Sequence, residues 1–243
     1  CVAVLQQMKV NSLNDTSLLQ LLKEVYLKLN DWEQLEKLLP ALEKNSVIDG
    51  QEAELIRVRI FIENLYRIGN QRIDFSDTEI SAQLEKAWKK GTALYKYDEK
   101  IVKHYADLLF KLDQKEQASK AIEVALNKSW SDELIKRYGE LDFGTSHRQL
   151  LIAESWIQNR PGNARLLVTL GRLAMRNELW GKAREYFDKS IEISSTAEAH
   201  GELARLLKFL GEEKLADEHQ EKFLQRVGAQ LPNLSMPKAL DKV

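Results

Sequence analysis

A helix-turn-helix pattern that returns along the chain limits its fold more than any other feature. The clearest copy covers residues 164–195, with Gly171 in the expected first helix and Trp180, Ala183 and Phe187 in the second. Gly171 and Ala183 lack bulk where the two helices would cross, so the helix axes can approach closely. Trp180 and Phe187 are expected to fill the space beside this crossing. One hairpin cannot bury its own apolar face, so neighbouring copies must stack.

Three further segments, residues 16–44, 99–128 and 197–226, repeat the same order of large and small residues. The residues that match the packing positions of the clearest copy are Leu22, Tyr26, Trp32, Ala106, Ala118, Ala204 and Ala216. A chance amphipathic helix would have the period of 3.6 residues but not this fixed spacing between two helices. The pattern is that of tetratricopeptide repeats (TPR), and it predicts an all-α superhelix, or solenoid, of helix pairs.

The remaining segments fit the template less well. Degenerate helices are expected over residues 50–90 and 130–160, so that residues 1–227 form one continuous solenoid, with a bend at the loop around Asn70 left open. Only 11 Gly and 4 Pro occur in 243 residues, which favours helix almost throughout. Two of these prolines lie in residues 228–243, which we expect to form an extended or disordered tail.

Composition argues against several classes of function. The formal net charge of −1 gives no overall attraction to nucleic acid, and a single cysteine excludes an internal disulfide framework. The four histidines are His104, His147, His200 and His219, and no two of them have zinc-ligand spacing. No glycine-rich phosphate loop or dinucleotide-binding turn is present. We therefore expect no catalytic residue, no metal site and no enzymatic activity.

The concave face of a TPR stack is made by the first helix of each repeat, and here that face is expected to be basic. Its predicted residues are Lys100, Lys103, Phe110, Lys111, Arg165, Arg172, Met175, Arg176, Arg205 and Lys208. Such a groove suits an extended or helical acidic segment of a protein partner, and binding should depend on salt. It lacks the interleaved aromatic residues of a nucleic-acid platform. Reversing the charge of Arg172 and Arg176 is expected to weaken binding without unfolding the domain. The alternative is that these cations form only a solvated face.

Three stretches carry a family resemblance. Residues 18–32 (LLQLLKEVYLKLNDW), residues 87–109 with AWKK and HYADLL, and residues 156–183 with LGRLA resemble the HemY proteins, in that order along the chain. The resemblance implies a bacterial inner-membrane protein with an N-terminal anchor and a TPR region that acts in late protohaem synthesis. It implies that this chain is the soluble part of a longer protein, facing the cytoplasm, with the anchor before Cys1. The expected function is a scaffold that recruits late haem-synthesis enzymes.

A direct haem or porphyrin carrier is the second reading that the resemblance suggests. A haem iron is usually held by an axial His or Met, and the available candidates are His104, His147, His200 and Met175. No Cys-x-x-Cys-His attachment motif is present. His200 falls at a large-residue position of its repeat, where a packing role is the better interpretation.

Overall fold

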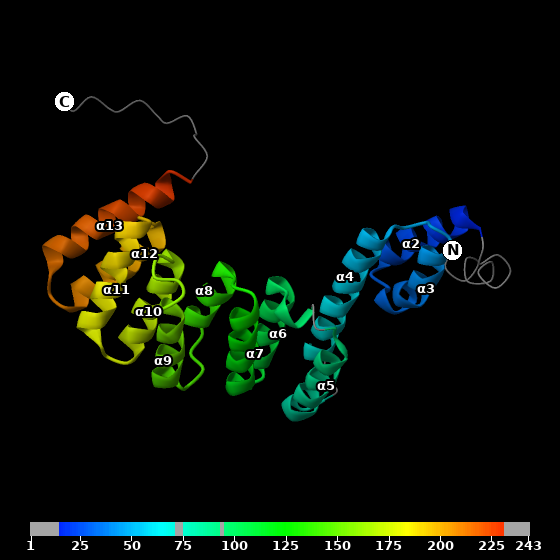
Figure 1. Ribbon diagram of the computed structural model, residues 1–243, viewed down its shortest axis with the longest axis horizontal. Coiled ribbons are helices and arrows are strands. Elements are labelled where there is room, and N and C mark those ends of the chain that lie inside the picture. The colour runs from blue at the N-terminus through cyan, green and yellow to red at the C-terminus, as the bar shows by residue number, and fades with distance from the viewer. Residues whose placement is uncertain (1–14, 71–74, 93–94, 231–243) are drawn as a thin grey trace, which may run out of the picture. The chain divides into compact units, whose positions relative to one another are not determined.

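The computed structural model describes residues 15–70, 75–92 and 95–230. The chain divides into two compact units, Cys1–Ser129 and Trp130–Val243. In the described residues twelve α-helices and one short 3-10 helix follow one another without a strand (Figure 1). None of these described helices is both long enough and apolar enough to cross a membrane.

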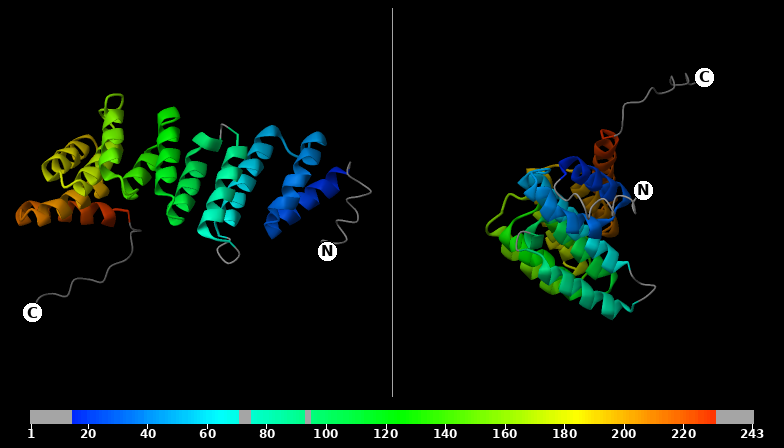
Figure 2. Two further views of the ribbon diagram at one scale, coloured as in Figure 1. Left: turned by 90° about the horizontal axis from the view of Figure 1, so that it is seen from below. Right: turned by 90° about the vertical axis from the view of Figure 1, so that its right-hand side faces the viewer.

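The first unit holds the predicted repeats 16–44 and 99–128 with the irregular segment between them. Its described helices are α2 (Thr16–Leu29), α3 (Trp32–Lys44), α4 (Gly50–Gly69), α5 (Asp77–Lys90), the 3-10 helix η1 (Tyr95–Tyr97), α6 (Glu99–Lys111) and α7 (Lys115–Lys128). The neighbours α2 and α3, α4 and α5, and α6 and α7 pack as hairpins, and α4 also contacts α6. The helices α4 and α5 run side by side (Figure 2).

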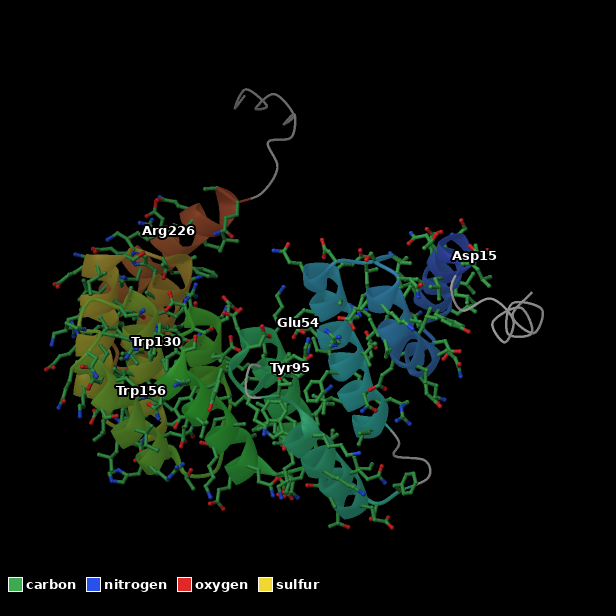
Figure 3. All side chains as sticks on the ribbon, turned by 45° about the vertical axis from the view of Figure 1, so that its right-hand side comes forward. Asp15, Glu54, Tyr95, Trp130, Trp156 and Arg226 are labelled. Atoms are coloured by element: carbon green, nitrogen blue, oxygen red, sulfur yellow. The ribbon has the colours of Figure 1, made fainter. Side chains whose placement is uncertain are left out.

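The second unit holds the degenerate pair and the two clearest repeats. Its described helices are α8 (Asp132–Glu140), α9 (Ser146–Ile157), α10 (Ala164–Arg176), α11 (Trp180–Ile193), α12 (Ala197–Phe209) and α13 (Glu213–Gly228). The tightest pairs are α10 with α11 and α12 with α13, and α10 also packs on α8 and α9. Trp130 and Trp156 meet edge to face at the start of this unit, with ring centroids 5.9 Å apart (Figure 3).

Short polar side chains start most of these helices. An N-terminal helix turn has backbone N–H groups without a partner in the helix, and a preceding Asp, Asn or Ser can accept from them. The carboxylate of Asp98 accepts from Ile101 N at 3.0 Å, and the amide oxygen of Asn163 accepts from Leu166 N at 2.7 Å. Ser76 and Glu79 form a reciprocal capping box at the start of α5.

The turn between the two helices is the same in all four predicted repeats. In each, the turn contains a residue with left-handed backbone, and these residues are Asn30 (φ 53°), Asp113 (φ 57°), Glu178 (φ 58°) and Gly211 (φ 80°). The next N–H then bonds back to a carbonyl in the first helix, and these bonds are Asp31 to Tyr26 (2.9 Å), Gln114 to Leu109 (2.9 Å), Leu179 to Ala174 (2.9 Å) and Glu212 to Leu207 (3.0 Å). This closure satisfies carbonyls that a helix end leaves free. The all-α TPR fold predicted from the spacing is confirmed.

The small residues of the template mark the closest helix contacts. A Cβ added at Gly171 would lie 2.6 Å from ring carbons Cδ1 and Cζ of Phe187, so only glycine allows this approach. Ala183 and Phe187 are fully buried. Most of the other template residues are buried as well, namely Leu22, Tyr26, Ala106, Ala118, Ala204 and Ala216. Lys23 occupies the position in its repeat that Gly171 occupies in the clearest copy. Its side chain is buried, and its ammonium group pairs with Glu52 at 2.6 Å.

The irregular segments are helical as expected, with small differences at their ends. Gly69, expected in a loop, is the last residue of α4, and Gly228, expected in the tail, ends α13. Residues 231–243 of the predicted tail lie outside the described residues. A single continuous solenoid over residues 1–227 and a bend near Asn70 remain predictions.

Candidate partner-binding surface

The predicted groove residues are divided between the two units. Lys100, Lys103, Phe110 and Lys111 lie on α6 in the first unit. Arg165, Arg172, Met175 and Arg176 lie on α10, and Arg205 and Lys208 lie on α12, all in the second unit. On α6, Lys100 and Lys111 are exposed and Lys103 is half-buried. The ammonium group of Lys115 lies 6.0 Å from the centre of the Phe110 ring.

The second unit contains an open hollow of about 820 Å³ that gathers four of the predicted residues. Its walls come from the end of α8, from α10, from the start of α11 and from the end of α12. The lining residues are Gly139, Glu140, Arg172, Met175, Arg176, Trp180, Glu202, Arg205, Leu206, Phe209 and Leu210. Arg165 lies instead in a smaller depression beside it, together with Val168 and Glu198.

Ion pairs with two carboxylates of α12 balance much of the positive charge at this hollow and beside it. Arg172 Nη2 lies 2.7 Å from Glu198 Oε1, and its Nε donates to Glu202 Oε1 at 2.7 Å. Arg165 Nη1 donates to Glu198 Oε2 at 2.6 Å, and Arg205 Nη2 donates to Glu202 Oε2 at 2.6 Å. Burial opposes the charge of Arg172, but its bonds to Glu202 and Glu198 outweigh this and raise its pKa. The two carboxylates thus hold three of the predicted cations.

Arg176 is engaged differently, because it closes the end of α8. Its Nη1 donates to the carbonyl oxygen of Leu141 at 3.0 Å, and its Nη2 donates to that of Glu140 at 2.7 Å. A cation suits a helix C-terminus, where carbonyls lack partners in the helix. Burial nevertheless lowers the pKa of Arg176. The expectation that Arg172 and Arg176 could be reversed without harm to the fold is therefore revised, because both side chains tie helices together.

Three large apolar side chains are exposed at the hollow, beside the exposed charged residues Glu140 and Arg205. Phe209 is 85% exposed, Trp180 is 43% exposed and Leu210 is 43% exposed. Large apolar side chains that share one exposed hollow mark a binding surface more often than isolated ones do. Trp180 was predicted to pack beside the helix crossing, and this prediction is wrong. Ala183 and Phe187 occupy the inner face of α11, and the Trp180 indole lies at the rim of the hollow. Its counterpart Trp32 in the first unit is half-buried, with the Arg59 guanidinium 5.5 Å from the ring centre.

Glu198, Glu202 and Phe209 at or beside this hollow were not predicted from the sequence. A signal for two of them was present, because Glu198 on α12 stands 33 residues after Arg165 and Phe209 stands 33 residues after Arg176. Extending the groove positions of α10 by one repeat would have placed both on the same face. No predicted groove residue lies 33 residues before Glu202, so the repeat spacing does not point to it. It is recognised only from the structure, where it binds Arg172.

Of the candidate haem ligands, His104 lies in the first unit, and His147, Met175 and His200 lie on three different helices of the second. The Tyr66 hydroxyl lies 3.0 Å from His104 Nδ1, in the first unit. His200 is buried, as its packing interpretation requires, with Nε2 2.7 Å from Ser195 Oγ and Nδ1 2.9 Å from His219 Nδ1. His147 is exposed on α9, and Met175 lines the hollow. Across the described ranges, no three His, Cys, Asp or Glu side chains gather as a metal site would require. Cys1 lies outside these ranges.

Burial, and after it the charges of His219, Arg226 and Lys222, lower the pKa of His200 to about 4. Burial also lowers the pKa of His219. Both rings are therefore neutral near pH 7, and one Nδ1 can donate to the other. The same cluster includes Arg226, which donates to Ser195 Oγ at 2.6 Å (Figure 3). This arrangement holds α13 against α12 and leaves His200 without a free nitrogen.

No family model and no curated protein matches the chain. Solved structures share its general form. MamA 41-end from Desulfovibrio magneticus RS-1 is 19% identical, with a TM-score of 0.45 over 70% of this chain and 97% of that one. TTC0263, a thermophilic TPR protein of Thermus thermophilus, is 17% identical, with a TM-score of 0.45 over 70% of this chain and 93% of that one. Likenesses of this degree carry no argument about function.

Proposed function

We propose that this chain is a non-catalytic TPR scaffold that binds protein partners through the hollow of its second unit. As the HemY resemblance implies, we further propose that its partners are late haem-synthesis enzymes at the bacterial inner membrane, with this region facing the cytoplasm. The first proposal follows from side chains of the second unit. The second follows from the resemblance of residues 18–32, 87–109 and 156–183.

The observation that carries the scaffold proposal is the set of exposed apolar side chains beside paired charges. Phe209, Trp180 and Leu210 face a hollow of about 820 Å³, which is large enough for a few side chains of a partner. Aromatic residues in the centre of an interface contribute much of its binding energy. Since Glu198 and Glu202 already hold Arg172, a partner that buries this surface need not leave that guanidinium without a counter-charge.

The partner's anchor is therefore apolar rather than acidic. Arg205 remains more than half exposed despite its bond to Glu202, and Lys208 is exposed one turn further along α12. These two cations lie on the exposed side of α12, where a carboxylate of the partner can meet them. We expect a modest salt dependence, because exposed ion pairs contribute little to affinity and are screened by salt.

The test uses purified late haem-synthesis enzymes and the purified chain, with binding measured by biolayer interferometry. Trp180→Ala and Phe209→Ala remove exposed side chains of the hollow. Leu151→Ala is the matched control, because Leu151 is 55% exposed on α9 of the same unit and does not line the hollow. We expect each hollow variant to weaken binding by about tenfold or more, and the control to change it by less than about twofold.

Two results would separate the parts of the proposal. If none of the late enzymes binds the wild-type chain, the haem assignment fails. If an enzyme binds and all three variants bind it equally well, the hollow is not the binding surface.

A further inference from the structure

The first unit contains a second groove, of about 670 Å³, formed by α3, α4, α5 and η1. Its apolar lining includes Leu39, Ile60, Phe61, Ile68, Ala87 and Tyr95. Its charged lining residues are Glu36, Arg57, Arg67, Lys86 and Lys90. No residue of the predicted concave face lines it. It differs from the hollow of the second unit in the balance of its charges.

The aromatic floor of this groove is fixed in place. The rings of Phe61 and Tyr95 lie 5.0 Å apart between centroids. Gly91 makes this arrangement possible, because a Cβ there would lie 2.7 Å from Phe61 Cζ. Tyr95 is also hydrogen-bonded to the Glu54 side chain, and burial raises the pKa of Tyr95 (Figure 3). A floor held in this way can receive an apolar side chain with little reorganisation.

Three carboxylates near the groove already form ion pairs. Glu43 and Glu54 pair with Arg57, at 2.5 Å and 3.6 Å. Glu33, on the same helix as Glu36, pairs with Lys37 at 2.6 Å. Among the lining residues, Glu36 is the one carboxylate, whereas Arg67, Lys86 and Lys90 contribute three positive charges besides the paired Arg57.

Lys86 and Lys90 stand one helical turn apart on α5, and the described residues offer neither an ion pair. Neither has a carboxylate three or four residues away on its own helix; each has the other. Like charges at this spacing destabilise a helix. Lys89, on another side of the same helix, is instead paired with Glu85 at 2.6 Å. The two lysines that line the groove are thus the ones on α5 whose positive charge no carboxylate of the described residues balances. A bound anion would reduce the repulsion between them.

We propose that this groove binds an acidic segment of a protein partner. Apolar side chains of that segment rest on the floor of Ile60, Phe61 and Tyr95. Two carboxylates about 6 Å apart meet Lys86 and Lys90, matching the separation of side chains one helical turn apart. The charge excess selects the sign of the occupant, and the aromatic floor selects a segment that also carries apolar residues.

The test uses the purified chain and two fluorescein-labelled peptides that share their Phe and Leu residues, one carrying Glu and the other Lys at every charged position. Fluorescence anisotropy reports binding at low and high salt. The groove variant is Lys86→Glu/Lys90→Glu. The control, Lys89→Glu/Lys120→Glu, makes the same charge change in the first unit at lysines that are paired with Glu85 and Glu116.

We expect the Glu peptide to bind more tightly than the Lys peptide, and more weakly as salt rises. The groove variant should lower the affinity for the Glu peptide by about tenfold or more relative to the control variant. Equal binding of the two peptides, or equal effects of the two double variants, would overturn the proposal. Circular dichroism checks that both variants remain helical. Because all four substitutions lie in the first unit, this result is independent of the hollow formed by Trp180 and Phe209.

Discussion

Replacing Gly171 by alanine should destabilise the second unit, although alanine is the better helix former. The added methyl carbon would lie 2.6 Å from Phe187 Cδ1 and Cζ, and closer still to Cε1. Carbon atoms in contact normally lie about 3.5–4.0 Å apart, so the overlap is about 1 Å. The Phe187 ring is fully buried in a cluster with Ala183 and Leu203 and has no open space to enter. The helices α10 and α11 must therefore separate.

The size of the effect follows from two opposing terms. Overpacking a core costs about 1–3 kcal/mol, and an overlap this large against a fixed ring belongs at the upper end. Alanine regains up to about 1 kcal/mol over glycine inside a helix. We expect a net loss of about 2 kcal/mol in the free energy of unfolding. Urea denaturation followed by circular dichroism would measure it, and hydrogen exchange should place the loss in α10 and α11.

Two further variants test whether the contact with Phe187 causes the loss of stability. Gly181→Ala adds a methyl group in α11 with no atom within 4 Å, so it should leave stability unchanged or raise it by up to about 1 kcal/mol. Phe187→Leu removes the ring that Gly171→Ala strikes, so the double variant should lose less than the sum of the single variants. A wild-type urea midpoint for Gly171→Ala would refute the close crossing of α10 and α11.

Two other predictions concern the second unit. Arg176→Met should keep a long side chain but lose both hydrogen bonds to the end of α8. We expect urea denaturation to show a free energy of unfolding lower by about 1–3 kcal/mol. An unchanged urea midpoint would show that these two hydrogen bonds do not stabilise the fold. The second concerns His200, whose pKa is lowered to about 4 by burial and by the charges of His219, Arg226 and Lys222. Below pH about 6.5 the unfolded chain takes up the proton first, so stability should be complete above that pH and fall as the pH drops toward 4. Urea midpoints at pH 7.5 and 5 should differ less for His200→Phe than for wild type, and an equal difference in both would count against the neutral histidine pair.

The repeats could be predicted from the sequence because their packing depends on local spacing. Small residues at Gly171 and Ala183, with large ones at fixed distances, leave few alternatives to a helix hairpin. The common turn was not predicted, since its left-handed position is occupied by Asn30, Asp113, Glu178 and Gly211 in turn, with no shared residue type. Asn and Asp tolerate this conformation, whereas Glu178 adopts it against its preference. There the packing of α10 on α11 decides the backbone.

The direction of Trp180 could not be read from its position in the template. A residue at the start of a helix can turn its side chain inward or outward, and Ala183 with Phe187 already fills the inner space. The placement of the predicted groove residues was also beyond the sequence, because their positions divide between two compact units. Repeat spacing describes contacts between neighbouring helices and carries little information about longer-range arrangement.

The meaning of a charge in this fold depends on the helix one repeat further on. Arg165 and Arg172 look like free cations when α10 is considered alone, but Glu198 and Glu202 on α12 bind them. Lys86 and Lys90 are not among the predicted residues of the concave face. In the described structure neither forms an ion pair with a carboxylate of a neighbouring helix. Since a pair that is already formed gains little from an incoming anion, affinity for acidic ligands should follow the unpaired cations rather than the total number. We therefore expect the proposed acidic partner at the groove beside α5 rather than at α10, and mainly apolar contacts at the hollow of Trp180 and Phe209.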